Sequence, residues 1–281
     1  MDPYAANARG EGRYPPGMPW KMKKHPEYDL FLFIGQSNMA GRGVTGERWP
    51  QRAPELLPGA GYEYRAVSDP GHLHPIAEPF GAAENRSGGI DEPGRKTGSL
   101  VTAFVNAYYA ATGTPVIGVS ASVGGSGIAE WQGEEDFLSD AIRRWTDAER
   151  FLAEQKIPVR HRYMLWCQGE TDGDRGTGPE TYKAKFRAMF AQLQGWGVEN
   201  CFLIPIGQYN GIHGYDYTAI HQAQLELAQE VPGVVLASDG FGAMRARGLM
   251  KDSYHYYQQA YNEVGTEAGK TVGDFVNTKQ G

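Results

Sequence analysis

The sequence predicts an α/β fold of the doubly wound type, in which helices cover both faces of a parallel sheet. Short apolar runs alternate with longer amphipathic runs along the 281-residue chain, which is the order of β-α-β units. The apolar runs also lack the polar alternation of half-exposed strands, as expected of strands that are buried on both faces. The chain is long enough to bury a complete core.

The first strand is predicted at residues 30–34, Leu-Phe-Leu-Phe-Ile. Gly35 then permits a sharp turn, and Ser37 with Asn38 begins a helix. Five strands joined by right-handed crossovers are expected in all. The later elements are predicted at 99–111 (helix), 115–121 (strand), 137–155 (helix), 162–167 (strand), 181–194 (helix), 201–206 (strand), 217–229 (helix), 234–237 (strand) and 256–276 (helix).

Two segments interrupt this alternation. Residues 1–28 are predicted to form an N-terminal arm, and residues 29–281 a single domain. Residues 42–98 form a long excursion rich in Pro and Gly, directly after the first strand and its turn. Loops of this length inside a domain are usually functional or disordered, and we expect this one to form a rim that shapes a substrate site.

The composition excludes several classes of protein. With 41% hydrophobic and 21% charged residues, the chain is an ordinary globular protein. Its net charge of −6 makes nucleic acid and anionic membranes unexpected partners. No apolar run approaches the roughly 18 residues that span a bilayer. Residues 1–28 contain no apolar segment typical of a signal peptide; if a leader was removed, we expect a secreted or periplasmic protein, and otherwise a cytoplasmic one.

Ser37 stands at the most informative position of the chain, directly after the first predicted strand and its turn. A hydroxyl there lies above the carboxyl end of a strand, where open α/β sheets bind ligands. Backbone N–H groups at the start of the following helix point near it and can hold an oxyanion. Taken alone, Ser37 fits either a helix N-cap or a nucleophile.

Two further polar segments follow predicted strands. Gly124 and Gly125 come after the second strand, where they either let backbone N–H groups approach a ligand or simply form a tight turn. Gln168 comes after the third strand, and its side-chain amide is able to donate to an oxyanion. The acidic residues that follow Gln168 fit helix-entry solvation equally well.

Asp252 and His255 are spaced for a hydrogen bond between carboxylate and imidazole, just before the last predicted helix. The two side chains can point the same way, so that Asp252 fixes the Nδ1 proton and leaves Nε2 free as a base towards a serine. The alternative is a capping aspartate beside an exposed histidine.

Metal and cofactor motifs are not found. His72 and His74 lack a third ligand at suitable spacing, so a surface loop is the favoured interpretation. Residues 41–46 match G-x-G-x-x-G but begin beyond the serine turn, whereas the dinucleotide fingerprint begins at the strand end. P-loop and G-x-S-x-G patterns are absent. Cys167 and Cys201 are expected to be buried free thiols.

Together, four segments resemble the conserved blocks of the SGNH hydrolase superfamily. The most similar branch is carbohydrate esterase family 6, the sialate O-acetylesterase-like group that includes acetylxylan esterases. The segments follow the family's order and span residues 29 to about 275. They are Gly35-Gln-Ser-Asn-Met-Ala-Gly-Arg-Gly43, Gly124-Gly-Ser-Gly-Ile-Ala-Glu-Trp131, Trp166-Cys-Gln-Gly-Glu-Thr-Asp172 and Asp252-Ser-Tyr-His255.

The resemblance implies a flavodoxin-like, three-layer α/β/α fold with a five-stranded parallel sheet, and a serine esterase that needs no metal or cofactor. By position, it makes Ser37 the nucleophile, His255 the base and Asp252 the acid that orients the base. It also suggests Glu170 as a supporting acid for His255.

The same resemblance implies an oxyanion hole. Its donors would be the backbone N–H groups of Ser37 and of Gly124 or Gly125, with the side-chain amide of Gln168. Other branches of the superfamily carry asparagine in the third segment, so Gln168 departs from them but agrees with this branch. Substrate contacts are predicted for Gln36, Asn38, Arg42 and Trp131.

The predicted activity is the removal of O-acetyl groups from a carbohydrate, such as acetylated xylan or an oligosaccharide, through an acyl-enzyme. The alternatives are a sialate O-acetylesterase, a short-chain lipase or thioesterase of the same superfamily, and a non-catalytic carbohydrate-binding domain. Candidate sugar-stacking residues are Trp131, Tyr209, Tyr215, Tyr254 and parts of 42–98, although aromatic residues are also ordinary core material.

Overall fold

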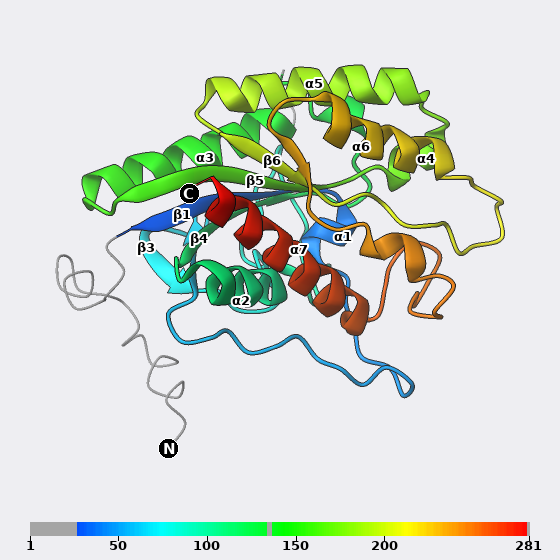
Figure 1. Cartoon of the computed structure of the whole chain (residues 1–281), viewed down its shortest axis with the longest axis horizontal. Coiled ribbons are helices and arrows are strands. Elements are labelled where there is room, and N and C mark those ends of the chain that lie inside the picture. Colours follow the sequence, from blue (N-terminus) through cyan, green and yellow to red (C-terminus); the bar gives the residue numbers. More distant parts are fainter. Residues whose placement is uncertain (1–26, 134–136, 280–281) are drawn as a thin grey trace.

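The computed structural model describes residues 27–133 and 137–279. A seven-stranded sheet in the order β3-β2-β4-β1-β5-β6-β7 forms its middle layer, and helices lie on both faces (Figure 1). Every neighbouring pair of strands is parallel except β2 and β3. The predicted three-layer α/β/α class is therefore confirmed.

All five predicted strands are present, and the chain adds two more from the excursion. The strands are β1 (Tyr28–Gly35), β2 (Gly61–Arg65), β3 (Asp69–Pro75), β4 (Val116–Ser122), β5 (Val159–Cys167), β6 (Asn200–Leu203) and β7 (Val234–Leu236). The helices are α1 (Ser37–Ala40), α2 (Val101–Thr112), α3 (Phe137–Glu154), α4 (Glu170–Arg175), α5 (Pro179–Gly195), α6 (Thr218–Glu230) and α7 (Gln258–Thr278). The described residues also contain two short 3-10 helices, η3 (Ile128–Glu130) and η4 (Gly240–Ala243).

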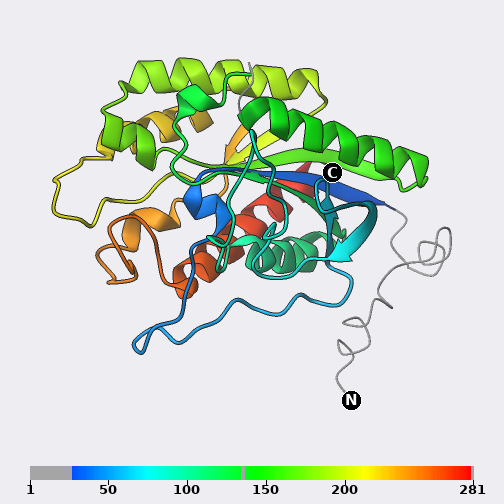
Figure 2. The ribbon, with the colours of Figure 1, turned by 180° about the vertical axis from the view of Figure 1, so that it is seen from behind.

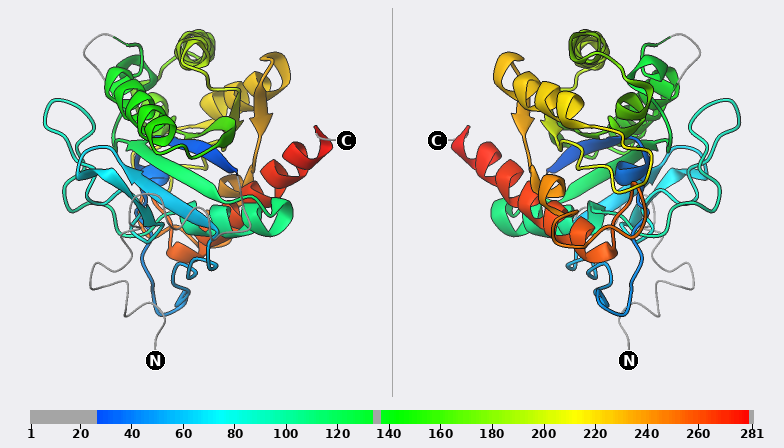
Figure 3. Two further views of the ribbon diagram at one scale, coloured as in Figure 1. Left: turned by 90° about the vertical axis from the view of Figure 1, so that its left-hand side faces the viewer. Right: turned by 90° about the vertical axis from the view of Figure 1, so that its right-hand side faces the viewer.

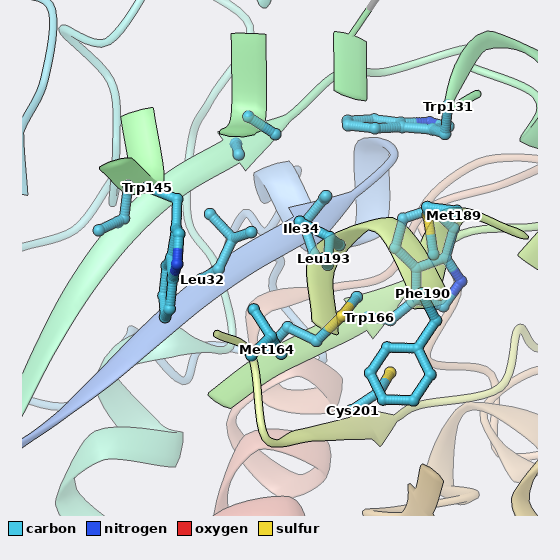
Figure 4. Close-up of a cluster of buried hydrophobic side chains, with 14 of the residues drawn as sticks. Leu32, Ile34, Trp131, Trp145, Met164, Trp166, Met189, Phe190, Leu193 and Cys201 are labelled. Atoms are coloured by element: carbon cyan, nitrogen blue, oxygen red, sulfur yellow. The ribbon is translucent and has the colours of Figure 1, made fainter. Parts of the chain in front are cut away.

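β1 lies at the centre of the sheet, between β4 and β5, and its apolar run is buried on both faces. Phe31 and Phe33 pack in a cluster with residues of α2 and α7, whereas Leu32 and Ile34 pack in a cluster with residues of α3, α5 and α6. Figure 4 shows Leu32 and Ile34 among aromatic and apolar side chains of the second cluster. Each such side chain stabilises the fold by about 1.5–3 kcal/mol, which is why a run without polar alternation becomes a central strand.

α2 and α7 cover the same face of the sheet and lie in direct backbone contact. A Cβ atom at Gly265 would lie 2.4 Å from the Leu100 carbonyl oxygen, and one at Gly269 would lie 2.3 Å from that of Phe104. Glycines four residues apart share one face of a helix. This face therefore fixes how closely α7, and the loop before it, approach the rest of the fold.

The excursion at 42–98 is more ordered than its composition predicts, and the expectation of a loop throughout is wrong. β2 and β3 form a hairpin that extends the sheet at its edge. Buried carboxylates support it: Glu84 accepts hydrogen bonds from the backbone of Val67 (2.8 Å) and Ser68 (3.2 Å), and Glu63 from that of Gly81 (2.9 Å). Residues 42–60 run along α2 and α7 (Figures 1 and 2), where Asn262 of α7 donates to the Arg52 carbonyl group.

The predicted arm falls outside the described residues up to residue 26, and Tyr28 already belongs to β1. Cys167 and Cys201 are buried free thiols, as expected. Within the described ranges, no helix has the length and apolar character needed to cross a membrane.

Candidate active site

The central strands end at the same level of the sheet. Gly35 of β1 pairs with Ser122 of β4 on one side and with Cys167 of β5 on the other. The segments that follow these parallel strands therefore meet at one edge of the sheet, which is where open α/β sheets bind ligands. The right-hand panel of Figure 3 views this edge, with α1 at the end of β1.

The turn after β1 requires glycine. Gly35 has φ +147°, and a Cβ atom there would lie 2.1 Å from the Cys167 carbonyl oxygen. This close approach lets the Gln36 N–H group donate to the same oxygen at 2.9 Å. α1 begins at the next residue, so Ser37 is held at a fixed point on the sheet edge and remains only 6% exposed.

The structure brings Ser37, His255 and Asp252 together. His255 Nε2 lies 3.0 Å from Ser37 Oγ, and His255 Nδ1 lies 3.0 Å from each carboxylate oxygen of Asp252. Asp252 also accepts hydrogen bonds from the backbone N–H groups of Tyr254 and His255, both at 2.8 Å. The loop before α7 thus folds around the Asp252 carboxylate and presents the imidazole to Ser37.

Electrostatics favour a charged Asp252. Burial alone would raise the pKa of this carboxyl, but hydrogen bonds from the His255 imidazole and from the Tyr254 and His255 backbone outweigh that effect. The net result is a pKa below the ordinary value of 3.8. A charged Asp252 holds the proton on Nδ1 of His255, which leaves the Nε2 lone pair facing Ser37.

A pocket of about 160 Å³ adjoins this trio. Its volume suits a small acyl group and not a sugar ring together with that group. The lining residues are Gln36, Ser37, Gly125, Glu170, Thr171, Asp174, Tyr254 and His255.

The pocket contains two backbone donors. Within the described part of the chain, the Ser37 and Gly125 N–H groups have no hydrogen-bond acceptor. Gly124, by contrast, donates its N–H group to the carboxylate of Glu92. Gly125 has φ +76° with open space around it, so its backbone faces the pocket without a side chain in the way. Of the two glycines predicted as donors, the geometry favours Gly125.

Gln168 is placed differently from the prediction, which assigned its amide to an oxyanion hole. It is fully buried, and its Nε2 atom donates to Asp172 (2.6 Å) and shares its second proton between the Ser126 carbonyl (2.9 Å) and Gln36 Oε1 (3.2 Å). Both amide protons therefore have partners inside the protein. The amide on the pocket wall belongs to Gln36, whose Oε1 accepts the N–H group of Gly169 at 3.0 Å.

Three of the four predicted substrate contacts lie away from the pocket. Arg42 is 9% exposed and pairs with Glu92, and Trp131 is fully buried with its Nε1 donating to Ser126 Oγ at 3.0 Å (Figure 4). Asn38 is fully buried as well. Their polar groups are used within the fold, so of the predicted set only Gln36 lines the pocket.

Asn38 links the elements that carry the trio. Its Nδ2 donates to Glu170 Oε1 and to the Tyr254 carbonyl (3.2 Å), and its Oδ1 accepts from the hydroxyl of Tyr261 in α7 (2.6 Å). One side chain of α1 is thereby bonded to α4, to the loop of His255 and to α7. This arrangement fixes Ser37 and His255 relative to each other.

Glu170 borders the pocket but does not bond to His255, because both ring nitrogens of His255 face Asp252 and Ser37. Its Oε2 atom is buried without a partner in the described ranges. Burial raises the pKa of Glu170 above 4.5, against the opposing hydrogen bond from Asn38. The predicted supporting acid is thus a carboxyl group beside the acetyl-sized pocket, without direct contact to the imidazole nitrogens.

Several residues at this edge were not predicted as site residues. Glu92 comes from the excursion and is bonded to Arg42 and Gly124, while Thr171 and Asp174 line the pocket. No pocket-lining residue comes from 42–98, so the predicted rim is wrong at the pocket itself. His72 and His74 both bond to Asp69, and the described residues contain no metal-binding cluster of three or more His, Cys, Asp or Glu side chains.

Comparison with known proteins identifies one family and a shared fold. The family model for carbohydrate esterases of the sialic acid-specific acetylesterase type matches residues 27–272. A protein from Arabidopsis thaliana shares 20% identity over 89% of this chain and 100% of its own, with a TM-score of 0.68. A carbohydrate acetylesterase from Xanthomonas citri shares 17% identity over 88% of this chain and 57% of its own, with a TM-score of 0.54.

NanS shares 14% identity over 91% of this chain and 99% of its own, with a TM-score of 0.56. None of the curated proteins matches in sequence. At these identities, the structural likeness shows the fold alone.

Proposed function

We propose a function on the premise that this chain belongs to the family of carbohydrate esterases of the sialic acid-specific acetylesterase type. The chain is a serine esterase that removes O-acetyl groups from a carbohydrate through an acyl-enzyme. The observation that carries the proposed mechanism is the 3.0 Å separation between Ser37 Oγ and His255 Nε2, with Asp252 on the other side of the ring.

In the first half-reaction, His255 Nε2 takes the proton of the Ser37 hydroxyl as Oγ attacks the acetyl carbonyl carbon. The carbonyl oxygen becomes negative and accepts hydrogen bonds from the N–H groups of Ser37 and Gly125. Each such donor stabilises the transition state by roughly 3–4 kcal/mol. The protonated His255 then gives its proton to the sugar oxygen, the C–O bond breaks, and the deacetylated sugar leaves.

In the second half-reaction, water attacks the acetyl-Ser37 ester while His255 accepts one of its protons. The tetrahedral intermediate collapses, the proton returns to Ser37 Oγ, and acetate is released. Asp252 remains charged throughout and stabilises the imidazolium form of His255. No metal or organic cofactor takes part in either half-reaction.

Gln168 and Asn38 act as positioning residues in this proposal. Gln168 bonds to Gln36 Oε1 at 3.2 Å and so steadies the residue before Ser37. Asn38 holds the loop of His255 through the Tyr254 carbonyl group. Neither side chain touches the acetyl group.

The geometry also weighs against the other candidate functions. A pocket of about 160 Å³ suits an acetyl group better than a long acyl chain, which disfavours a lipase. A binding module has no use for a serine, a histidine and an aspartate at hydrogen-bonding distance in series. The contacts that distinguish acetylated xylan from acetylated sialic acid must therefore lie outside this pocket.

Acetate release tests the proposal. The protein is incubated with 4-nitrophenyl acetate, acetylated xylan and O-acetylated sialic acid, and acetate is quantified. We expect hydrolysis of the simple ester and of at least one acetylated carbohydrate, and loss of both in Ser37→Ala. Absence of hydrolysis with every substrate, or equal rates in the variant, would overturn the proposal.

A further inference from the structure

A second and larger cavity lies at the same edge of the sheet. Its volume is about 640 Å³, within the range of about 300–1,000 Å³ typical of ligand sites. It is formed by the segment after β6, the start of α6 and the region of η4. The mechanism proposed above uses none of its residues.

The linings of the two cavities are in direct contact. Tyr209 lines the large cavity, and its ring lies 5.4 Å, centroid to centroid, from that of Tyr254 in the small pocket. Tyr217 lines the large cavity and donates its hydroxyl to Asp174 of the small pocket at 2.6 Å. The large cavity therefore adjoins the pocket of Ser37, and the two share a wall of side chains.

The large cavity offers one open ring face, that of Tyr215, which is 38% exposed. The Tyr215 ring packs on that of Tyr209 (5.0 Å between centroids), and Tyr209 in turn packs on Tyr217 (5.9 Å); these two supporting tyrosines are each only 4% exposed. Ile212, in the same segment, is 96% exposed. Exposed apolar groups gathered beside a cavity indicate a binding surface, and tyrosine presents an apolar face together with a polar tip. A sugar ring, with apolar C–H faces and polar edges, matches that chemistry.

The charges at the cavity favour an uncharged ligand. Asp216 and Asp239 line it, and Asp174 stands in the wall. Hydrogen bonds from Thr218 lower the pKa of Asp216, which keeps that carboxyl charged. Arg245 is the one arginine or lysine on the lining, and His221 is held by Asp239 at 2.7 Å. A carboxylated sugar would thus meet more negative than positive charge.

We propose that the cavity bounded by Tyr209, Tyr215, Tyr217, His221, Asp239 and Arg245 is a subsite for the further sugar residues of a neutral glycan chain. This inference rests on the proposed function and names its substrate class: an acetylated neutral oligosaccharide or polysaccharide, and not a single acidic sugar. The acetyl group occupies the small pocket, the sugar that bears it lies at the mouth of that pocket, and the next residue stacks on Tyr215.

Binding is measured first, in a form that does not depend on hydrolysis. The Ser37→Ala protein is titrated by calorimetry with unacetylated xylotetraose, with xylose and with 3′-sialyllactose. We expect xylotetraose to bind at least about tenfold more tightly than the other two, since only it fills the subsite without added charge. Tighter binding of 3′-sialyllactose, or no binding of xylotetraose, would overturn the proposal.

Tyr215 then localises the site. In the Ser37→Ala background, Tyr215→Ala should weaken xylotetraose binding by about five- to tenfold, as expected for loss of one stacked ring, while Tyr215→Phe keeps the ring and the affinity. Trp196→Ala is the matched control, because Trp196 is also an exposed aromatic residue (52%) but precedes β6 at the opposite edge of the sheet. Unchanged affinity in Tyr215→Ala, or equal loss in Trp196→Ala, would contradict the assignment.

Kinetics separate this inference from the proposed function. With Ser37 present, Tyr215→Ala should lower the ratio of kcat/KM on acetylated xylotetraose to kcat/KM on 4-nitrophenyl acetate by about five- to tenfold. If the wild-type protein hydrolyses both esters and Tyr215→Ala leaves this ratio unchanged, the subsite is refuted and the proposed esterase activity stands. A wild-type protein that hydrolyses neither refutes the esterase, and the binding titration still decides the subsite.

Discussion

The Nε2 atom of His255 lies 3.0 Å from the Oγ atom of Ser37, although 218 positions separate the two residues in the chain. Ser37 is positioned by the central strand β1, and His255 by the loop before α7. α7 reaches its place because Gly265 and Gly269 allow backbone contact with α2. The 3.0 Å separation is thus set by helix packing as well as by the sheet edge.

Replacement of Ser37 by alanine should abolish esterase activity and preserve the fold. Loss of a triad member costs about 10⁴–10⁶ in rate, whereas the hydroxyl contributes no core packing. Turnover of 4-nitrophenyl acetate and the thermal unfolding midpoint are the two measurements. A serine-directed organophosphorus reagent should also label the wild-type protein once, on the peptide that contains Ser37. Turnover close to wild type in Ser37→Ala would refute serine catalysis.

Replacement of Asp252 by alanine should lower kcat by about 10³–10⁴, by analogy with loss of a triad acid, because nothing then holds the proton on Nδ1 of His255. The measurement is steady-state kinetics on an acetyl ester. Asp274→Asn serves as control, since Asp274 is an exposed carboxylate on α7. Equal kcat values in Asp252→Ala and the control would show that the Asp252 carboxylate has no part in the reaction.

Acyl-chain length should decide between an acetylesterase and a lipase. The small pocket of about 160 Å³ accepts an acetyl group, and each further methylene must be accommodated against Glu170, Tyr254 or His255. We expect kcat/KM on acetyl esters to exceed that on octanoyl esters by at least about tenfold, a ratio that a few poorly fitting methylenes can supply. Rates that stay level or rise from acetyl to octanoyl would reassign the enzyme to the lipases.

Much of this arrangement follows from local sequence. An apolar run without alternation predicts β1, and glycine followed by a polar residue predicts the turn that carries Ser37. The Asp252–His255 hydrogen bond is also local, because it depends on three residues of spacing and a helix start. These features need no knowledge of the tertiary structure, and the structure has them where the sequence predicts them.

The wrong predictions concern side chains whose direction depends on distant partners. Gln168 and Trp131 follow strands at the predicted edge, but both side chains are buried. Gln168 donates a hydrogen bond to the carbonyl oxygen of Ser126, and Trp131 donates one to the Ser126 hydroxyl oxygen. Glu92 reaches Gly124 across 32 positions from a segment whose Pro and Gly content predicts no structure. β2 and β3 were not predicted because the two strands contain few apolar residues. Tyr62, Tyr64 and Leu73 are nevertheless buried in the core, beside the buried carboxylate of Glu63.

The charge of the buried Glu170 side chain can be tested by measuring protein stability as a function of pH. Its side chain is 3% exposed, Oε2 has no partner in the described ranges, and burial raises its pKa above 4.5. The folded protein therefore keeps a proton on Glu170 over a pH range in which the unfolded chain has lost it. Because the folded state binds more protons there, the free energy of unfolding must fall as pH rises from about 4.5 towards the folded pKa.

Glu170→Gln should remove this loss of stability. Glutamine cannot ionise, and its Oε1 atom can still accept the hydrogen bond from Asn38. We expect the variant and the wild type to have similar free energies of unfolding in urea at about pH 4, and the advantage of the variant to grow as pH rises from there towards the folded pKa of Glu170. Glu47→Gln, at an exposed position, controls for the loss of one surface charge and should show no such trend. A difference that is constant with pH, or a variant that becomes less stable than wild type as pH rises, would mean that Glu170 is already ionised in the folded protein and that the acetyl pocket is bordered by a negative charge.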